Sequence, residues 1–287
     1  MTASAGVNRP EAGGGSEGGR PPSKETASSI TSRQVVRYRG QLESVSDDLV
    51  VEEPMEIRMG GEPIAVIMRT PGHDDELALG FAITEGIVSG PGDVAEIRDL
   101  GEGRWELALA DGVSIDPEQF RRNFYSTSSC GVCGKASIDA IRVAQTFPPP
   151  GPEVPVEAIV DLPERLLERQ SAFHATGGLH AAGAFLPTGE VVAVREDVGR
   201  HNATDKLVGA LARQEWPVAP MGLMVSGRVS FEIVQKAAVA GLPIVCGVSA
   251  ASSLAVDLAE EFGMTLIGFL REGVFTVYTD VDRIKGL

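Results

Sequence analysis

The sequence predicts an α/β protein with two parts: a larger C-terminal α/β domain with a mostly parallel sheet, and a smaller N-terminal α+β domain. Three observations predict this class. Strand-like and helix-like segments alternate from residue 156 to the end of the chain, a pattern typical of a parallel sheet flanked by helices. A proline-rich run at 147–152 separates this region from an earlier one with hairpin signals. Apolar residues make up 43% of the chain, enough to fill a substantial core.

The first 33 residues are rich in Gly, Ser, Pro and Glu and show no apolar periodicity. Because such a segment cannot bury enough apolar surface to offset its conformational entropy, we expect residues 1–33 to form a disordered tail.

The α+β domain is expected over residues 34–147. Two β-rich runs joined by Gly60-Gly61 predict a hairpin, and acidic residues at 74–76 predict the first turn of a helix. The expected elements are a hairpin of residues 50–59 and 64–70, a helix from 74 to about 88, short strands around 105–110, and a helix at 136–145.

The C-terminal domain is expected over residues 156–287. Its predicted elements are a helix at 163–173, a hairpin of strands 181–186 and 190–195, a helix at 202–212, a strand at 221–225, a helix at 230–240, a strand at 243–247, a helix at 252–262, and strands at 265–270 and 274–279. Residues 237–256 carry no charge and are long enough to span a bilayer. However, Gly241-Leu242-Pro243 would break a membrane helix, so we expect a helix end, a buried strand and a new helix there.

Charge and cysteine content exclude several classes of protein. The chain has 25 basic and 40 acidic side chains, a formal charge of −15. This balance argues against a sequence-independent nucleic-acid binder and against attachment to anionic membranes. Three cysteines do not make a disulfide framework. The N-terminus has no signal-peptide pattern, so we expect a cytoplasmic protein without nucleic-acid or membrane partners.

The strongest local feature is the pair Cys130-Gly-Val-Cys133, in a Ser/Gly-rich loop just before a predicted helix. Amide groups at a helix start and the nearby Lys135 both favour a thiolate, the form that attacks sulfur or binds metal. A sulfur carrier needs such an exposed, low-pKa thiolate.

A structural zinc site is the main alternative for the pair. It needs four ligands, and His174 and His180 could be recruited, although their spacing fits no common zinc finger. A thioredoxin-like enzyme would place the pair early in a βαβ unit, which the surrounding short strands do not offer. Cys246 lies in an apolar strand and is expected to be an inert core thiol.

Three predicted strand-to-helix junctions form the second feature, at residues 195–202, 226–228 and 249–253. Ligands usually bind at such junctions in open α/β sheets, and helix starts with nearby arginines suit phosphates. N-capping by Asn202 and Ser252 would explain only part of the pattern. We therefore expect Arg200, His201 and Arg228 to line an anion or nucleotide pocket. No Walker or G-x-G-x-x-G sequence is present, so this would not be an ordinary NTPase or Rossmann site.

Several strings, taken in order, resemble one family, the formate dehydrogenase accessory sulfurtransferases. These proteins are sulfur carriers of molybdenum-cofactor maturation. The matching strings are Arg69-Thr-Pro-Gly, Glu76-Leu-Ala-Leu-Gly-Phe, Ser129-Cys-Gly-Val-Cys-Gly, Thr176-Gly-Gly-Leu-His-Ala-Ala, Glu196-Asp-Val-Gly-Arg-His-Asn, Asp205-Lys, Ser226-Gly-Arg, Gly247-Val-Ser-Ala, Leu266-Ile-Gly-Phe and Tyr278-Thr.

The resemblance implies a sulfurtransferase that accepts sulfur from a cysteine desulfurase as a persulfide on Cys130, with Cys133 as the second thiol. It implies delivery to Mo-bis(molybdopterin guanine dinucleotide), bound as the transferred substrate, before insertion into the formate dehydrogenase catalytic subunit. The family's members are similar in forming homodimers. Its cofactor-binding stretch falls here on Phe269, Leu270, Arg271, Glu272, Gly273 and Val274.

The larger domain of this family resembles the cytidine-deaminase fold. A zinc deaminase needs His-x-Glu and a later Pro-Cys-x-x-Cys, but the corresponding regions here read His180-Ala-Ala and Ser226-Gly-Arg. We therefore expect no bound metal and no deamination. The alternative function is a non-enzymatic chaperone for the cofactor or the apoenzyme, with a structural metal at the cysteine pair.

Overall fold

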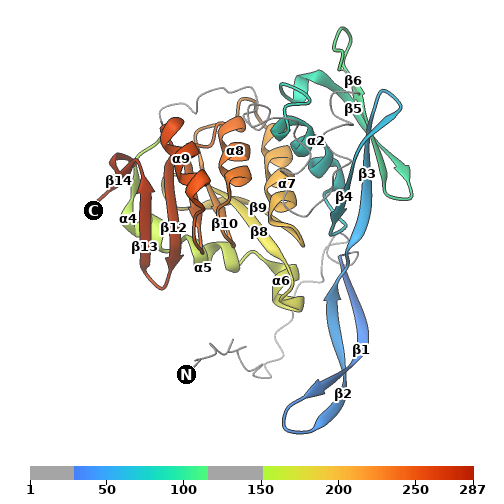
Figure 1. Ribbon diagram of the computed structural model, residues 1–287, viewed down its shortest axis with the longest axis horizontal. Coiled ribbons are helices and arrows are strands. Elements are labelled where there is room, and N and C mark those ends of the chain that lie inside the picture. The colour runs from blue at the N-terminus through green and yellow to red at the C-terminus, as the bar shows by residue number, and fades with distance from the viewer. Residues whose placement is uncertain (1–28, 116–150) are drawn as a thin grey trace.

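The computed structural model describes residues 29–115 and 151–287 (Figure 1). The predicted helix at 136–145 and the cysteine pair at 130 and 133 lie outside these residues. Within them, helices and strands are mixed, and the predicted α/β class is confirmed. None of the helices in the two described ranges is long and apolar enough to cross a membrane.

A six-stranded sheet forms the centre of the C-terminal half. Its order is β13-β12-β11-β10-β8-β9. The strands are β8 (His180–Phe185), β9 (Val191–Asp197), β10 (Gly222–Val225), β11 (Ile244–Gly247), β12 (Thr265–Arg271) and β13 (Val274–Thr279).

The prediction of a mostly parallel sheet is wrong, because the sheet is mixed. Strands β10, β11 and β12 are parallel, whereas β8, β9 and β13 pair antiparallel with their neighbours. The two outer hairpins are the cause. Each edge of the sheet ends in a strand that turns straight back on the one before it, β9 on β8 and β13 on β12. Helices link β9 to β10, β10 to β11 and β11 to β12.

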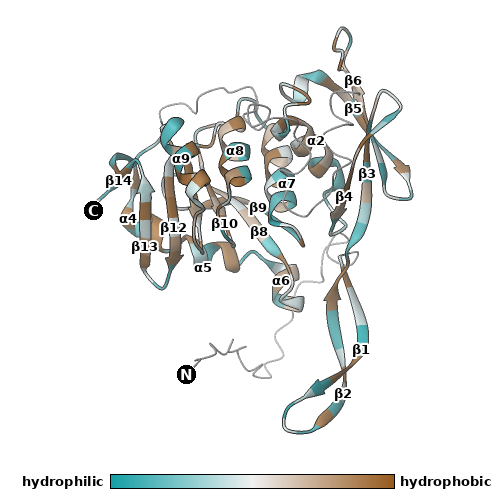
Figure 2. Cartoon of the chain, in the orientation of Figure 1, coloured by the Kyte–Doolittle hydropathy of each residue, from teal (hydrophilic) through white to brown (hydrophobic). Residues whose placement is uncertain are grey.

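Helices cover both faces of this sheet. Helices α7 (Arg200–Ala212), α8 (Phe231–Val239) and α9 (Ser253–Glu261) lie on one face, and α4 (Val156–Val160) and α5 (Leu162–Leu167) lie on the other (Figure 1). Strand β10 shows the alternation that this requires: Leu223 and Val225 join the core under α7 to α9, and Met224 joins the core under α4 and α5. Figure 2 shows the resulting apolar interior of the layers.

The helix predicted at 163–173 is two helices, α5 and α6 (Ser171–Thr176), separated at residues 168–170. The stretch at 237–256 is divided as predicted between α8, β11 and α9. A short parallel pair, β7 (Val154–Pro155) with β14 (Ile284–Lys285), closes the C-terminus.

The N-terminal half has a four-stranded sheet of order β4-β3-β6-β5. Its strands are β3 (Glu53–Met59), β4 (Glu62–Arg69), β5 (Val94–Gly101) and β6 (Arg104–Leu109), and α2 (Asp74–Thr84) follows β4. The hairpin around Gly60 and Gly61 is confirmed. Both glycines have positive φ values, of 60° and 81°, which suits a tight hairpin turn.

A separate two-stranded ribbon, β1 (Ile30–Tyr38) with β2 (Leu42–Val50), projects from the body of the molecule (Figure 1). The tail predicted through residue 33 therefore ends too late, because residues 30–33 pair with β2. Residues 30–33 contain one apolar side chain, Ile30, and therefore show no alternation of apolar and polar residues. This is why the sequence placed them in the disordered tail.

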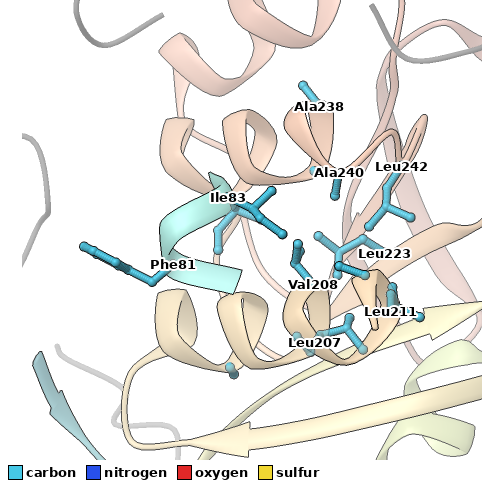
Figure 3. Close-up of a cluster of buried hydrophobic side chains, with 14 of the residues drawn as sticks. Phe81, Ile83, Leu207, Val208, Leu211, Leu223, Ala238, Ala240 and Leu242 are labelled. Carbon is cyan, nitrogen blue, oxygen red and sulfur yellow. The ribbon is translucent and has the colours of Figure 1, made fainter. Parts of the chain in front are cut away.

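Helix α2 joins the two halves by packing against α7. Gly80 and Gly209 bring the helices very close: a Cβ atom at Gly80 would lie 1.8 Å from the carbonyl oxygen of Asp205, and one at Gly209 would lie 2.0 Å from that of Glu76. Figure 3 shows Ile83 of α2 directed toward Val208 of α7, with Leu207 and Leu211 of α7 in the same cluster. One hydrophobic core therefore contains side chains from both halves. The division into domains at the proline-rich segment stays a prediction.

Candidate functional site

The carboxyl ends of β10, β11 and β12 meet at one edge of the six-stranded sheet. We call this the carboxyl edge. Backbone hydrogen bonds join the loops that leave it: Ser249 N donates to Gly227 O (3.3 Å), Ser252 N to Val229 O (3.0 Å) and Phe269 N to Ser249 O (3.1 Å). Two of the three predicted junctions, with Phe269, therefore lie side by side.

The remaining junction reaches the same edge through strands β8 and β9. His180 begins β8 and pairs with Asp197 at the end of β9, and Ser226 N donates to Ala181 O (3.0 Å). Helix α7 begins at Arg200, directly after β9. The starts of α7, α8 and α9 consequently all face this edge, where their free amide groups favour anions.

His180, Gly227 and Arg200 are in contact at the centre of the edge. A Cβ atom at Gly227 would lie 3.3 Å from Nδ1 of His180 and 3.9 Å from Cδ of Arg200. Burial, together with the positive charges of Arg200 and Arg228, lowers the pKa of His180, and Asp197 opposes this only in part. The lowered pKa favours the neutral imidazole, on which the positive charges of both arginines act.

Arg200 has an unused hydrogen-bond donor. Its Nε is buried and has no partner among the residues that the structure describes. A buried donor without an acceptor is costly and uncommon in folded proteins. Together with Arg228, which is exposed at the loop after β10, it makes this edge suitable for binding an anion.

His201, predicted beside Arg200, contacts residues at the start of α8. Its Nε2 is 3.1 Å from Oγ of Ser230 and 3.8 Å from a carboxylate oxygen of Glu232, so it bridges the starts of α7 and α8. Burial and the charges of Lys236 and Arg200 lower the pKa of His201 to about 3. Its neutral ring serves packing between the helices in this structure.

The expected capping residues behave differently from each other. Ser252 caps α9, because its Oγ accepts a hydrogen bond from Ala255 N (3.3 Å). Asn202 lies inside α7, whose N-cap is Gly199. Its Nδ2 donates to Met68 O (2.8 Å) and to Oδ1 of Asp197 (2.9 Å), so Asn202 ties α7 to β4 instead.

The stretch from Phe269 to Val274 forms the end of the β12–β13 hairpin. Glu272 and Gly273 both have positive φ values, of 52° and 76°, as in a two-residue hairpin turn. Phe269 is 39% exposed in a left-handed bulge, and Arg271, Glu272, Gly273 and Val274 are exposed. Leu270 is fully buried in the core under α4 and α5, so it anchors the hairpin rather than facing a ligand.

The cysteine pair, Cys130 and Cys133, lies outside the described residues, so the site described here consists of the carboxyl edge alone. Cys246 is fully buried in β11, and burial raises the pKa of its thiol, which agrees with its predicted role as an inert core residue. His174 donates from Nε2 to Leu167 O (2.9 Å).

Two buried lysines were not predicted as site residues, although Lys206 belongs to the matching string Asp205-Lys. Nζ of Lys206 lies 2.7 Å from Oδ2 of Asp197 and donates to Thr70 O at 2.7 Å. Oδ2 of Asp197 also accepts from Thr70 N at 3.0 Å. This group fixes the loop after β4 to the end of β9. A lysine next to an aspartate, as Lys206 is next to Asp205, normally indicates a solvated surface, so no local signal indicated its burial.

The second lysine joins three helices. Nζ of Lys236 on α8 lies 2.9 Å from Oδ1 of Asp205 on α7 and 2.9 Å from Oε1 of Glu85 after α2. Burial raises the pKa of Asp205 to about 6. Burial lowers the pKa of Lys236, but the two carboxylates outweigh it and the net shift is upward. Lys236 therefore stays charged.

A small polar cavity of about 160 Å³ lies between the loop after β4, the start of α6 and the end of β9. His73, Glu196 and Lys206 contribute to its wall. Their charged groups are engaged: Nδ1 of His73 is 3.2 Å from Oε2 of Glu76, and Glu196 accepts from the amides of Ala172 and Phe173 at the start of α6. We regard the carboxyl edge as the better candidate for a binding site.

Comparison with known proteins now decides the family. The FdhD/NarQ family model matches residues 50–285. The chain belongs to the FdhD/NarQ family. This confirms the family resemblance that the ordered strings predicted.

Relatives in this family carry the name "Sulfur carrier protein FdhD". The protein of that name from Streptomyces coelicolor is 48% identical over 272 residues, which cover 88% of this chain and 94% of the relative. The one from Sulfolobus acidocaldarius is 43% identical, covering 85% of this chain and 94% of the relative. A crystal structure described as a formate dehydrogenase accessory protein, from Desulfotalea psychrophila, matches with a TM-score of 0.72 at 22% identity, covering 89% of this chain and 99% of that one. That likeness shows the shared fold.

Proposed function

We propose that this FdhD/NarQ family member is a sulfur carrier that accepts sulfur on Cys130 and delivers it to a nucleotide-bearing molybdenum cofactor destined for formate dehydrogenase. The observation that carries the proposal is the identity of 48% over 88% of the chain with a protein named as a sulfur carrier. The Cys130-x-x-Cys133 pair supplies the chemistry that such a role requires.

The first step is a thiol exchange with a persulfide on a cysteine desulfurase. The Cys130 thiolate attacks the outer sulfur of the donor persulfide, an S–S bond forms on Cys130, and the donor cysteine leaves as a thiolate. Release of the outer sulfur as sulfide needs two electrons. Attack by the Cys133 thiolate on the inner sulfur supplies them and leaves a Cys130–Cys133 disulfide, which a cellular dithiol then reduces.

The carboxyl edge supports the second half of the proposal. A guanine-dinucleotide cofactor carries phosphates, and this edge offers Arg200 with a buried unused donor, Arg228, and the starts of three helices. Phe269 and the exposed hairpin turn after it border the same edge. The cofactor is the transferred substrate here, and these residues would hold its phosphates while the sulfur is added.

Mass spectrometry tests the sulfur step. After incubation with a cysteine desulfurase and cysteine, the wild-type protein should gain about 32 Da, one sulfur atom, on the peptide that contains Cys130. The Cys130→Ala variant should gain nothing there, whereas Cys246→Ala, which removes only a buried thiol, should still be modified. Full activation of formate dehydrogenase in cells by the Cys130→Ala variant would overturn the assignment.

Metal analysis separates this function from the alternative, a cofactor or apoenzyme chaperone whose cysteine pair holds a structural metal. We expect purified protein to contain no stoichiometric zinc. Zinc bound one to one, and lost when either Cys130 or Cys133 is replaced, would support the chaperone instead.

A further inference from the structure

His180 lies where three elements of the carboxyl edge meet. It begins β8, is half-buried, and pairs in register with Asp197 at the end of β9. A Cβ atom at Gly227, in the loop after β10, would lie 3.3 Å from Nδ1 and 3.4 Å from Cε1 of His180. The next nearest atom would be Cδ of Arg200, at 3.9 Å. The imidazole and the Arg200 side chain therefore adjoin the same point of this loop.

The cations beside His180 are not neutralised, whereas the carboxylate beside it is. Arg200 and Arg228 form no ion pair with any residue in the two described ranges, and Nε of Arg200 is buried without a partner there. Asp197 is held by Nζ of Lys206 at 2.7 Å and accepts three further hydrogen bonds. The edge at His180 consequently carries positive charge that awaits an acceptor.

The other titratable neighbours on β9 and α7 are engaged elsewhere. Glu196 accepts hydrogen bonds from two amides at the start of α6. Burial lowers the pKa of His201 to about 3, so its ring is neutral. The charges that act on His180 are then those of Arg200, Arg228 and Asp197, and together with burial they lower its pKa. In the free protein they favour an imidazole without the second proton.

A bound phosphate reverses this preference. A pyrophosphate diester brings two negative charges to the unpaired guanidinium groups and to the free amides at the starts of α7 and α8. Beside it, a protonated imidazole donates a charge-assisted hydrogen bond, whereas beside two arginines alone the same proton is only repelled. One side chain therefore favours opposite protonation states in the free and the bound protein.

We propose that His180 is a third cationic ligand of the phosphates at the carboxyl edge: it is neutral in the free protein and takes up one proton from solvent as the phosphates bind. This rests on the nucleotide site proposed above and adds to it a binding residue and a proton. The proton forms the second N–H bond of the ring and returns to solvent when the phosphates leave. Affinity should therefore fall, by up to roughly tenfold per pH unit, as the pH rises from the pKa of His180 in the free protein to its pKa in the complex.

Isothermal titration calorimetry with diguanosine pyrophosphate counts this proton. Both phosphates of the probe are diesters, so the probe itself does not titrate near neutral pH, whereas a terminal phosphate has a second pKa near 6. Titrations at pH 7 in PIPES and in Tris, whose ionisation heats differ widely, give the number of protons taken up. The wild-type protein should take up a substantial fraction of one proton per bound probe. EDTA in both buffers ensures that no metal ion on the histidine accounts for the result.

Two matched variants assign the proton to its residue. His180→Gln keeps a polar side chain that cannot be protonated, and should bind the probe more weakly, without proton uptake and with an affinity that is constant between pH 6.5 and pH 8. His174→Gln is the control, because His174 is exposed and its Nε2 lies 2.9 Å from Leu167 O. It should retain the wild-type proton uptake and the wild-type pH dependence.

Nuclear magnetic resonance follows the same proton without any change at the site. The chain has four histidines, so the Cε1–H signals of isotopically labelled histidine form a short set that single substitutions assign. Saturating probe should raise the pKa read from the His180 signal by about 1 or more and leave that of His174 in place.

The outcomes separate this proposal from the nucleotide site on which it rests. Binding without proton uptake, or uptake that persists in His180→Gln, would overturn the role of His180 and leave the nucleotide site standing. A wild-type protein that does not bind the probe at all would overturn both.

Discussion

The buried ion pairs that join α7 to the elements around it, which we call the junction, differ from the carboxyl edge of the six-stranded sheet in how their charged side chains are paired. At the junction every lysine is matched: Lys206 with Asp197, and Lys236 with Asp205 and Glu85, at distances of 2.7 to 2.9 Å. At the edge, Arg200 keeps a buried donor without a partner in the described structure, and Arg228 is exposed. Paired charge holds elements together, while unpaired charge of one sign is available to a ligand.

The largest effect is expected when a junction pair is broken. Lys206→Met leaves the carboxylate of Asp197, which is completely buried, without its cation, and should lower the free energy of unfolding by about 3–5 kcal/mol. Urea unfolding measures this. Lys285→Met is the control, because its pair with Glu153 is exposed and should contribute less than about 1 kcal/mol. Equal losses in both variants would show that burial of the pair does not matter.

A smaller loss of stability is expected when a glycine at the close contact between α2 and α7 is replaced. Gly80→Ala places a methyl group against the main chain of α7, which cannot move aside as a flexible side chain would, and should destabilise the protein by about 1–3 kcal/mol. Gly92→Ala is the matched control, since nothing lies within 4 Å of a Cβ atom there. Thermal unfolding of the two variants should separate them clearly. A Gly80→Ala protein as stable as Gly92→Ala would contradict the packing of α2 on α7.

The junction also predicts an unusual pH dependence. The pKa of His201 is lowered to about 3, so its contribution to stability is present above pH 6.5 and is lost as the pH falls below it. The pKa of Asp205 is raised to about 6, so it acts in the opposite direction: protonation of the folded state stabilises the protein as the pH falls from about 6 to 4. The two effects nearly cancel over that interval.

Replacing His201 should reveal the contribution of Asp205. Relative to the wild type, His201→Gln should gain about 2 kcal/mol of stability between pH 7.5 and pH 5, since one proton fewer is taken up on unfolding. The measurement is the difference in unfolding free energy at the two pH values. A constant difference would mean that the ring of His201 is not the buried neutral group.

The smallest effect on stability is expected at the carboxyl edge. Arg228→Gln should change the unfolding free energy by no more than about 0.5 kcal/mol, because the side chain is exposed. It should nevertheless reduce the rise in melting temperature that millimolar guanosine diphosphate produces in the wild-type protein. If neither guanosine nor adenosine diphosphate shifts the wild-type melting temperature, the edge is not a nucleotide site.

The sequence predicted most of the helices and strands, but not their neighbours in space. Short apolar runs located β10, β11 and β12, with Pro220 and Pro243 just before the first two, and residues 187–189 located the β8–β9 turn. The order of strands depends on long-range packing, so the antiparallel position of β8 beside β10 had no local signal. Lys206 and Lys236 were missed because a lysine in a sequence normally indicates a solvated surface, and only the fold supplies the buried carboxylates.

The candidate site was also predicted only in part, because local sequence indicates where elements begin but not which residues meet in space. The sequence located the strand-to-helix junctions that carry Arg200 and Arg228, because chain order alone determines where a strand gives way to a helix. Their role in binding a ligand stays a prediction. His201 and Leu270 lie next to residues at the edge in the sequence, yet one is directed between helices and the other into the core. The direction of a side chain depends on the packing around it, which adjacency in the sequence does not reveal.

The packing of α2 on α7 also has a consequence during synthesis on the ribosome. The apolar side chains of α2 are complete at residue 84, but the partner helix is finished only at residue 212. At 5–20 residues per second, roughly 6–25 s pass before the two can meet. Throughout that time Leu77, Phe81 and Ile83 have no native partner on α7. The nascent chain therefore exposes the apolar side chains of α2 for many seconds. During that interval chaperones that bind exposed apolar segments can bind this helix.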